Sequence, residues 1–316
     1  MVRLGRSELD VFPLCLGGNV FGWTADERQS FDVLDAYVAA GGNFIDSSDS
    51  YSAFAPGNVG GESETVLGNW FAARGNRADI VLATKVGRKP DRKGLSRANI
   101  RAAVQESLER LQTDYIDLYY AHADDPDTPL EETLTAFDEL VGEGKVRHIA
   151  ASNYAADRLE QALEISDHRG LARYVALQPH YSLLERNHYE GALAELCLGE
   201  GLACVPYWAL ARGFLTGKYR PGTSVDSPRA GQVAHYLEDD RAMGVLEALD
   251  RISEAHDTTV AAVALAWVRS QPAVAAPIAS ARNPHQLADI LPGATLELAG
   301  VELAELSDLS APAPTT

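Results

Sequence analysis

The chain has little cysteine and no long apolar run. Its three cysteines, Cys15, Cys197 and Cys204, are an odd number at unrelated spacings, which argues against a disulfide framework or a zinc knuckle. We expect three buried thiols and a reducing, cytoplasmic location. No run of about 18 uncharged apolar residues occurs and no signal-peptide core follows Met1, so we expect neither a membrane span nor export.

Positive charge is also scarce. The 316 residues include 27 lysines and arginines against 45 aspartates and glutamates, which gives a formal net charge of −18. Such a surface repels phosphate backbones and anionic membranes, so we expect no nucleic-acid partner and no membrane partner. Hydrophobic residues make up 46% of the chain, enough for a large core, and this composition excludes a disordered chain.

A nucleotide-binding glycine fingerprint is missing as well. No Gly-x-Gly-x-x-Gly occurs anywhere in the chain. Residues 213–219 (Gly-Phe-Leu-Thr-Gly-Lys-Tyr) resemble a phosphate-binding loop, but they have one residue too few between the glycines and a tyrosine where serine or threonine is needed. A six-stranded doubly wound sheet should carry the fingerprint after its first strand, so it is the weaker of two α/β alternatives.

What the sequence does contain is an alternation of short apolar runs with longer helical patterns. The runs lack polar alternation, as expected for parallel strands that are covered on both faces. Eight strands, each usually followed by a helix, predict a closed (β/α)8 TIM barrel as a single domain over residues 1–316. The expected strands are 15–17, 44–46, 80–85, 116–121, 147–152, 174–178, 203–207 and 274–278.

Two of the expected helices have recognisable ends. Ser96 is a candidate N-cap for a helix with one apolar face. Thr128 is a candidate N-cap for the next helix, with Pro129 at its first position and Glu131 placed for a capping box. Gly142 and Gly144 can end that helix. The apolar face of the first helix comprises Ile100, Val104, Leu108 and Leu111.

Polar residues follow several of the expected strands, where a TIM barrel carries its chemistry. Asp46 ends the second strand, and Tyr51 follows it in the run Asp-Ser-Ser-Asp-Ser-Tyr. Lys85 ends the third strand and His122 follows the fourth. Each residue alone says little, because a lysine at the end of an apolar run is often only solvated. Four ionisable groups of complementary type at three consecutive strands indicate a shared site. Further polar residues at strand ends are Ser152, Asn153, Gln178 and Tyr207.

If these four side chains meet, their chemistry suits carbonyl reduction. A tyrosine hydroxyl holds its proton with a pKa of about 10. A Lys85 cation held by Asp46 would lower that pKa and make Tyr51 a general acid. His122 can donate a hydrogen bond to a carbonyl oxygen on which negative charge develops. No side chain supplies hydride, so a nicotinamide cofactor is implied.

Several segments, in this order and spacing, resemble the aldo-keto reductase family and in particular its bacterial-type NADP-dependent members. The resemblance covers about residues 3–291. It implies a TIM barrel with an N-terminal β-hairpin and a cofactor-covering loop after the seventh strand. It also implies reversible, NADPH-dependent reduction of an aldehyde or ketone to an alcohol. The segments are 41–46 (Gly-Gly-Asn-Phe-Ile-Asp) before Tyr51, 82–87 (Leu-Ala-Thr-Lys-Val-Gly), 113–122, 144–147 (Gly-Lys-Val-Arg), 151–153 (Ala-Ser-Asn) and 213–219.

The resemblance implies roles for individual residues. Tyr51 would be the acid, Lys85 and Asp46 would tune it, and His122 would orient the carbonyl. Arg282 would bind the 2′-phosphate of NADP, since a guanidinium suits a phosphate dianion. The other implied cofactor-binding residues are Gly18, Asn19, Asp46, Ser152, Asn153, Gln178, Tyr207 (stacked on the nicotinamide), Leu210, Gly213, Leu215, Lys218, Ser280, Gln286 and Asp289.

Of three departures from the family pattern, two fall at cofactor contacts and none falls at the four catalytic candidates. Ala150 stands where glycine is usual, residues 208–209 (Trp-Ala) replace Ser-Pro after the stacking tyrosine, and Ile290 stands where an asparagine often contacts adenine. NADP is a polyanion and the chain is acidic. We therefore expect positive charge to be concentrated where the cofactor lies, at Lys218 and Arg282.

The substrate and the oligomeric state stay open. Trp23, Phe54 and Trp208 can line a substrate pocket or can instead cover the core of the barrel. From Lys85 to Arg101 there are seven lysines and arginines and one aspartate, which form either a solvated surface or a contact for an anionic substrate. Sugar phosphates, deoxysugar intermediates, aliphatic aldehydes and quinone-like carbonyls all remain candidate substrates.

Two other functions compete with carbonyl reduction. Some members of the family bind NADP as regulatory or redox-sensing subunits with little turnover, although the complete set of catalytic candidates favours an enzyme. A barrel enzyme that acts on phosphates through a metal needs clustered ligands. The remaining histidines show no paired ligand spacing, so we expect no metal. They are His148, His168, His180, His188, His235, His256 and His285.

Overall fold

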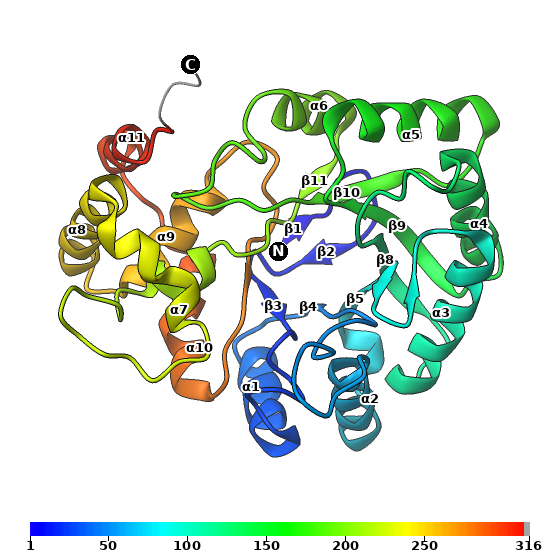
Figure 1. Ribbon diagram of the computed structural model, residues 1–316, viewed down its shortest axis with the longest axis horizontal. Coiled ribbons are helices and arrows are strands. Elements are labelled where there is room, and N and C mark those ends of the chain that lie inside the picture. The colour runs from blue at the N-terminus through cyan, green and yellow to red at the C-terminus, as the bar shows by residue number, and fades with distance from the viewer. Residues whose placement is uncertain (313–316) are drawn as a thin grey trace.

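Eight parallel strands curl into a barrel in the computed structural model, which describes residues 1–312 (Figure 1). Pairing follows the chain from β3 round to β11, and β12 pairs with β3. A bridge between Cys204 and Val274 closes the ring, so the doubly wound alternative is wrong. The strands are β3 (Cys15–Gly17), β4 (Phe44–Asp46), β5 (Val81–Val86), β8 (Ile116–Ala121), β9 (Val146–Ser152), β10 (Tyr174–Gln178), β11 (Ala203–Cys204) and β12 (Ile278–Ala279).

Helices follow the strands and cover the outside of the barrel (Figure 1). Ser96 caps α3 by accepting a hydrogen bond from the Asn99 N–H, and the four predicted apolar residues of this helix are buried, as expected. None of these described helices is both long and apolar enough to cross a membrane. The helices are α1 (Glu27–Ala39), α2 (Glu62–Arg74), α3 (Arg97–Leu111), α4 (Leu130–Gly142), α5 (Ala156–Arg169), α6 (Ala192–Glu200), α7 (Ala230–Val233), α8 (Asp240–Ala255), α9 (Val260–Arg269), α10 (Pro284–Ile290) and α11 (Gly300–Leu309), with 3₁₀ turns η1 (Arg77–Asp79), η2 (Ala211–Thr216), η3 (Ala234–Glu238) and η4 (Leu291–Ala294).

The expected bounds hold at four strands and shift at the other four. β5 and β9 differ from the expected 80–85 and 147–152 by one residue. The expected strands 203–207 and 274–278 are wrong by more, because β11 ends at Cys204 and β12 begins at Ile278. Pro206 and Pro277 explain both corrections, since proline has no N–H to donate to a strand ladder. Tyr207 therefore lies outside β11, three residues after its last residue, Cys204.

The expected N-cap of α4 is wrong by one residue. The helix begins at Leu130 with Pro129 in the N-cap position and without a side-chain cap. The hydroxyl of Thr128 instead donates a hydrogen bond to the carboxylate of Asp125 at 2.7 Å. The predicted end is confirmed, because α4 ends at Gly142 and Gly144 adopts a left-handed φ of 72°.

An N-terminal hairpin closes one end of the barrel, as expected. β1 (Val2–Arg3) pairs antiparallel with β2 (Asp10–Val11). Apolar residues of the hairpin are fully or almost fully buried against side chains at the starts of the barrel strands. The hairpin therefore plugs the amino-terminal end of the barrel and leaves the carboxyl-terminal end for chemistry. The packed residues include Leu4, Leu9 and Val11 of the hairpin and Cys15, Phe44 and Val81 of β3, β4 and β5.

The opposite end of the barrel carries the long connections. A short hairpin of β6 (Arg88–Lys89) and β7 (Arg92–Lys93) follows β5, and the expected loop after the seventh barrel strand contains η2 and α7. The three cysteines are buried and free, as expected. Residues 313–316 of the expected single domain lie outside the described residues, and the single-domain assignment stays a prediction.

Candidate active site

Asp46, Lys85 and Tyr51 form a hydrogen-bonded cluster at the carboxyl ends of β4 and β5. Lys85 Nζ donates to both carboxylate oxygens of Asp46, at 2.7 and 2.6 Å, and to the Tyr51 hydroxyl at 2.8 Å. The Tyr51 hydroxyl in turn donates to Asp46 Oδ2 at 2.8 Å. The backbone carbonyl of Ser47 accepts a further bond from Lys85 at 2.8 Å. The structure thus brings together three of the four predicted catalytic residues.

Burial controls the protonation of this cluster. The Lys85 and Asp46 side chains are 0% and 1% exposed, so their ion pair is out of contact with water. Burial lowers the pKa of Lys85, and the charge of Asp46 opposes that shift. Burial raises the pKa of Tyr51 well above its ordinary value, and Asp46 raises it further. The expectation of a lowered pKa for Tyr51 is therefore wrong for the net value, because burial favours the neutral phenol and Asp46, which accepts the hydroxyl proton, favours it further.

His122 follows β8 and lies beside Tyr51, with ring centroids 6.2 Å apart. Its Nδ1 lies 3.1 Å from the Ser48 hydroxyl and 3.4 Å from the Ser50 hydroxyl. Burial lowers the pKa of His122 well below its ordinary value, so the ring is neutral at neutral pH. With Nδ1 accepting a serine proton, the neutral ring presents its Nε2–H as a donor. Sequence reasoning missed the two serines, although both stand in the run that was singled out before Tyr51.

Polar residues at the ends of β9 and β10 and after β11 form a second network beside the cluster. Gln178 donates to Asp46 Oδ1 at 2.9 Å, and its backbone carbonyl accepts from the Ser152 hydroxyl at 2.9 Å. Asn153 donates to the His122 carbonyl at 2.9 Å, and the Tyr207 hydroxyl donates to Asn153 Oδ1 at 2.8 Å. These bonds fix the amide groups and the Tyr207 ring relative to the catalytic candidates.

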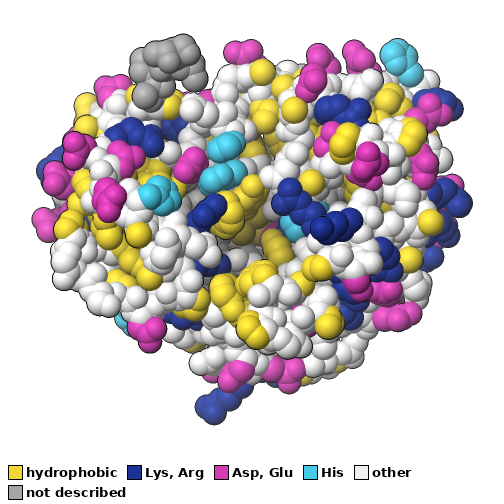
Figure 2. Space-filling view, viewed as in Figure 1, with side chains coloured by type: hydrophobic (Ala, Val, Ile, Leu, Met, Phe, Trp, Pro, Cys, Tyr) yellow, Lys and Arg dark blue, Asp and Glu magenta, His cyan; other side chains and the backbone are white. Residues whose placement is uncertain are grey.

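A cleft of about 700 Å³ gathers most of the predicted site residues. Figure 2 shows it as a hollow with hydrophobic side chains inside and lysines and arginines at its rim. Tyr51 and His122 line the cleft, whereas Asp46 and Lys85 are buried and do not. The predicted cofactor residues that line it are Asn19, Ser152, Asn153, Gln178, Tyr207, Leu210, Gly213, Lys218, Ser280, Arg282, Gln286 and Asp289.

Gly18 and Leu215, both predicted to contact the cofactor, do not line the cleft. The Gly18 N–H donates to the backbone carbonyl of Asp46 at 2.7 Å, so Gly18 braces the end of β4. Leu215 packs in the hydrophobic core, because η2 turns its side chain inward. The neighbouring residues Gly17 and Thr216 line the cleft in their place.

The three predicted substrate residues all line the cleft. Trp23 and Phe54 meet edge to face with ring centroids 4.7 Å apart. Phe54 is 63% exposed, so it does not cover the core of the barrel. Trp208 forms an aromatic wall beside Tyr207, at a centroid distance of 5.2 Å. The aromatic walls thus bound an apolar space next to Tyr51 and His122.

The segment after β11 holds residues in strained conformations. Trp208, Ala211 and Arg212 have φ values of 54°, 47° and 58°, in the left-handed region that residues other than glycine rarely adopt. The Arg212 guanidinium lies 3.9 Å from the centroid of the Trp208 ring, and both line the cleft. Such strain is typical of functional sites. Arg212 and Arg229 line the cleft although sequence reasoning did not assign them to the site. Arg88 also lines it, and belongs to the basic stretch from Lys85 to Arg101 that was left open between a solvated surface and a contact for an anionic substrate.

A pair of histidines packs against the ring of Tyr207. His180 stacks on both Tyr207 and His188, with centroid distances of 5.4 and 5.1 Å. His180, Glu185 and His188 each place a ligand atom within 4.8 Å of the others. The sequence shows no paired spacing for these histidines, yet His180 and His188 lie close together in the structure. A turn at residues 182–185 folds the loop back and brings them together. Burial lowers the pKa of His180 to about 4, and none of the three residues lines the cleft.

Comparison with known proteins fits this geometry. The sequence model described as the aldo/keto reductase family matches residues 13–311. Protein tas of Escherichia coli (strain K12) is 35% identical, over 96% of this chain and 95% of that protein. The uncharacterized oxidoreductase YrpG of Bacillus subtilis (strain 168) is 35% identical over 97% and 94%, and the norsolorinic acid reductase stcV of Emericella nidulans is 32% identical over 94% and 78%. The chain therefore belongs to the aldo/keto reductase family, whose members are oxidoreductases that act on carbonyl compounds.

Proposed function

We propose that this protein reversibly reduces an aldehyde or ketone to an alcohol, with NADPH as the cofactor and Tyr51 as the proton donor. One observation carries the proposal. The Tyr51 hydroxyl lies 2.8 Å from the buried ammonium of Lys85, and the Tyr51 side chain lines the cleft that His122 also lines. A phenol that is open to a ligand on one side and bonded to a buried cation on the other suits proton transfer to a carbonyl oxygen.

The residues of the cleft fit a dinucleotide phosphate. Lys218 and Arg282 line the cleft, and neither has a carboxylate within 4.0 Å among residues 1–312. Near Tyr51, the amides of Asn153 and Gln178 can hydrogen-bond a carboxamide, and the Tyr207 ring can stack on a flat heterocycle. A guanidinium binds a phosphate dianion through two hydrogen bonds, so Arg282 favours NADP over NAD.

When bound, the nicotinamide supplies the hydride that no side chain can provide. Tyr51, whose raised pKa keeps it protonated at neutral pH, gives its proton to the carbonyl oxygen as negative charge develops there. The resulting phenolate lies beside Lys85, whose ammonium stabilises it. Neutral His122 donates its N–H to the same carbonyl oxygen and orients it. Asp46 holds Lys85 in place, and Trp23, Phe54 and Trp208 surround the body of the substrate.

The test compares turnover with cofactor binding in one substitution. Purified protein should consume NADPH with a panel of aldehydes and ketones. Tyr51→Phe should lose turnover by about 100-fold or more, because it removes the general acid. It should still bind NADPH, as read by fluorescence titration. Tyr154→Phe is the matched control, since it removes a buried hydroxyl whose partner is Tyr174 and which does not line the cleft.

Unchanged catalysis in Tyr51→Phe would show that the assigned mechanism is wrong. Tight NADPH binding by the wild type without turnover on any carbonyl would instead favour a cofactor-sensing regulatory subunit. A cytoplasmic location and the absence of nucleic-acid partners stay predictions from the cysteine pattern and from the net charge of −18.

A further inference from the structure

The cleft concentrates cations that have no acidic partner. All 27 lysines and arginines lie in the described part of the chain, and 19 of them place a nitrogen within 4.0 Å of a carboxylate oxygen there. Among residues 1–312, Asp289 is the only one of the 45 aspartates and glutamates that lines the cleft. Five of the eight unpaired cations line it: Arg88, Arg212, Lys218, Arg229 and Arg282.

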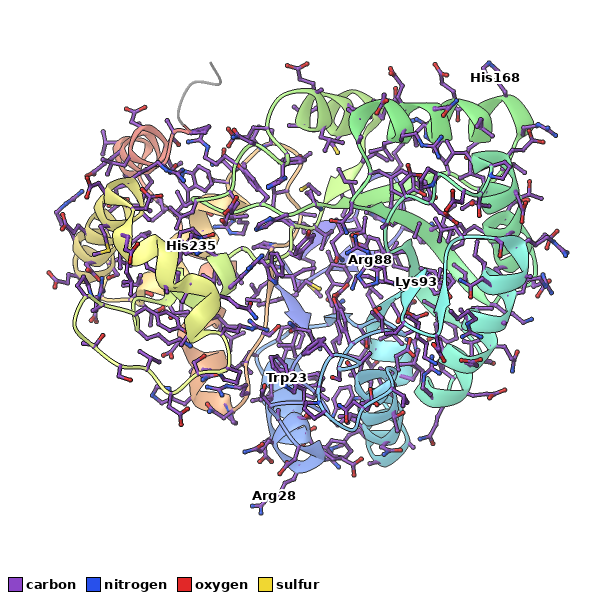
Figure 3. The ribbon with its side chains drawn as sticks, viewed as in Figure 1. Trp23, Arg28, Arg88, Lys93, His168 and His235 are labelled. Atoms are coloured by element: carbon purple, nitrogen blue, oxygen red, sulfur yellow. The ribbon has the colours of Figure 1, made fainter. Side chains whose placement is uncertain are left out.

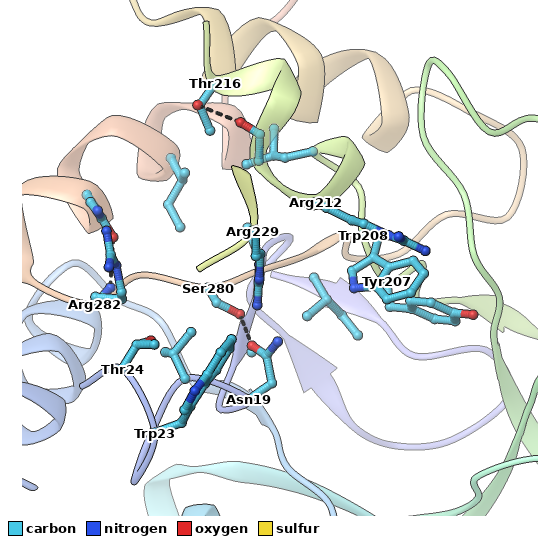
Figure 4. Close-up of a pocket in the computed structure, with 18 of the residues that line it drawn as sticks. Asn19, Trp23, Thr24, Tyr207, Trp208, Arg212, Thr216, Arg229, Ser280 and Arg282 are labelled. Carbon is cyan, nitrogen blue, oxygen red and sulfur yellow. Dashed lines mark hydrogen bonds between the residues drawn. The ribbon is translucent and has the colours of Figure 1, made fainter. Parts of the chain in front are cut away.

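Four of these five cations come from one side of the cleft. Arg212, Lys218 and Arg229 lie in the connection that follows β11, and Arg282 follows β12. Figure 4 shows Arg282, Arg229 and Arg212 spread along the cleft, with Arg212 beside Trp208 and Tyr207. NADP carries about two negative charges on its pyrophosphate and up to about two on its 2′-phosphate. These four cations can balance that charge.

Arg88 is the fifth cation and belongs to a different part of the barrel. It lies in β6, which directly follows β5, the strand that carries Lys85. Its guanidinium makes no hydrogen bond or ion pair with any residue from 1 to 312. In Figure 3, Arg88 is labelled in front of the strands of the barrel. Burial and Lys85 lower the pKa of His122, and the charge of Arg88 adds to that shift. Burial raises the pKa of Tyr207, and the charge of Arg88 opposes that rise, so Arg88 acts at the catalytic end of the cleft.

An exposed arginine or lysine without a carboxylate partner is ordinary on a surface, and Arg6, Arg28 and Lys93 are further examples among the described residues. Arg88 differs from these because it lines the cleft that the proposed general acid, Tyr51, also lines. Because the other four cations can balance the phosphates of the cofactor, the positive charge of Arg88 remains available for another anionic group. A guanidinium binds a carboxylate or a phosphate through two parallel hydrogen bonds. The aromatic rings of Trp23 and Phe54 also line the cleft and can cover an apolar body.

We infer that the natural substrate is an anionic carbonyl compound. Its carboxylate or phosphate group binds Arg88, its apolar body lies against the aromatic walls, and its carbonyl oxygen lies between Tyr51 and His122. This inference rests on the proposed reductase function and narrows its substrate class.

The test compares substrates that differ in charge and share one reacting group. 4-Carboxybenzaldehyde is compared with its neutral methyl ester, and 4-formylphenyl phosphate provides the phosphate arm. The wild type should have a higher kcat/KM for an anionic aldehyde than for the ester, mainly through KM, and added salt should reduce this preference. Whichever of the two anions shows the larger preference identifies the anionic group that the site takes.

Arg88→Gln should lower the ratio of kcat/KM between the preferred anion and the ester by about 10-fold, and Arg88→Lys should restore part of it. Lys93→Gln is the matched control, because Lys93 lies in the same β6–β7 hairpin, has no carboxylate partner among the described residues and does not line the cleft. It should leave the ratio at the wild-type value. An equal loss for anion and ester in Arg88→Gln would overturn the inference, and so would loss of the preference in Arg212→Gln alone.

A binding measurement separates this inference from the proposed function. Benzoate and phenyl phosphate should quench the fluorescence of Trp23 and Trp208, which line the cleft. Arg88→Gln should weaken binding of the preferred anion about 10-fold. If the protein binds the anion through Arg88 but reduces no carbonyl compound, the proposed reductase function is wrong and the anion site at Arg88 stands. If the protein reduces neutral carbonyl compounds but shows no anion binding that depends on Arg88, the reductase function stands and the inference of an anionic substrate is wrong.

Discussion

Lys85 Nζ lies 2.8 Å from the hydroxyl of Tyr51 and 2.6 Å from Asp46 Oδ2. One buried ammonium therefore serves a structural carboxylate and a proposed proton donor at the same time. Because Lys85 has no contact with water, its charge acts on Tyr51 with little screening. The stability of the cluster and its chemistry are consequently coupled, and substitutions can separate them.

Lys85→Met should impair both folding and turnover. The substitution leaves the carboxylate of Asp46 buried without its cation, which costs about 3–5 kcal/mol in the free energy of unfolding. It also removes the charge that stabilises the Tyr51 phenolate. Urea unfolding measures the first effect and steady-state kinetics the second.

Asp46→Asn introduced into Lys85→Met provides the control. With both charges gone, much of the free energy of unfolding should return, whereas turnover should stay low because Tyr51 still lacks its cation. If turnover returned together with stability, Lys85 would have only a structural role.

Arg282→Ala should change the choice of cofactor. The variant loses the proposed contact with the 2′-phosphate, so its affinity for NADPH should fall by about 10- to 100-fold while its affinity for NADH stays near the wild-type value. Fluorescence titration with both cofactors measures the difference. Arg28→Ala, which removes an exposed arginine outside the cleft, is the matched control. Equal weakening toward both cofactors would refute the role of Arg282.

The parts of the site that lie on strands could be predicted from the sequence. Asp46 and Lys85 stand at the ends of apolar runs, and parallel strands bring their carboxyl ends to the same side of a barrel. Ser96 as the cap of α3 is equally local, because a cap depends on the few residues that follow it. These features need only the order of the elements and a hydrophobic pattern.

Features on the loops could not be predicted in this way. Arg88 faces the cleft and Lys93, five residues later, does not, and no pattern in that basic stretch distinguishes them. The effect of Asp46 on Tyr51 depends on which rotamer brings the two oxygens to 2.8 Å. His180 meets His188 only because the loop turns back through tertiary contacts. Composition and periodicity hold no information on such packing.

Asp49 should make the stability of the wild type depend on pH. Burial, followed by the charge of Glu64, raises the pKa of Asp49 to about 7, whereas Arg110 and Arg92 oppose the shift. Its Oδ2 and the hydroxyl of Tyr119 are buried without hydrogen-bond partners among the described residues. An unfolded aspartate titrates near pH 3.9, so between about pH 4 and pH 7 the folded state binds more protons. The free energy of unfolding therefore falls as pH rises through that window and levels off above it.

The Asp49→Asn variant has no carboxyl group at position 49, so this contribution to the pH dependence of its stability is absent. Between pH 4 and pH 8 its free energy of unfolding should rise relative to that of the wild type by up to about 4 kcal/mol. Urea unfolding at several pH values measures the difference. Asp32→Asn removes an exposed carboxylate on α1 and is the control, which should run parallel to the wild type. A constant difference between Asp49→Asn and the wild type would contradict the raised pKa.

Two glycines within helices should respond to alanine in opposite directions. A Cβ on Gly68 in α2 would lie 2.1 Å from the backbone oxygen of Arg110 at the end of α3, so Gly68→Ala should force the helices apart and cost about 1–3 kcal/mol. A Cβ on Gly244 in α8 meets no atom within 4 Å, so Gly244→Ala should add about 0.5–1 kcal/mol through the better helix propensity of alanine. Urea unfolding of both variants provides the measurement, with Gly244→Ala as the control for a change in propensity alone. Equal stabilisation of both variants would mean that α2 and α3 do not pack as closely as described.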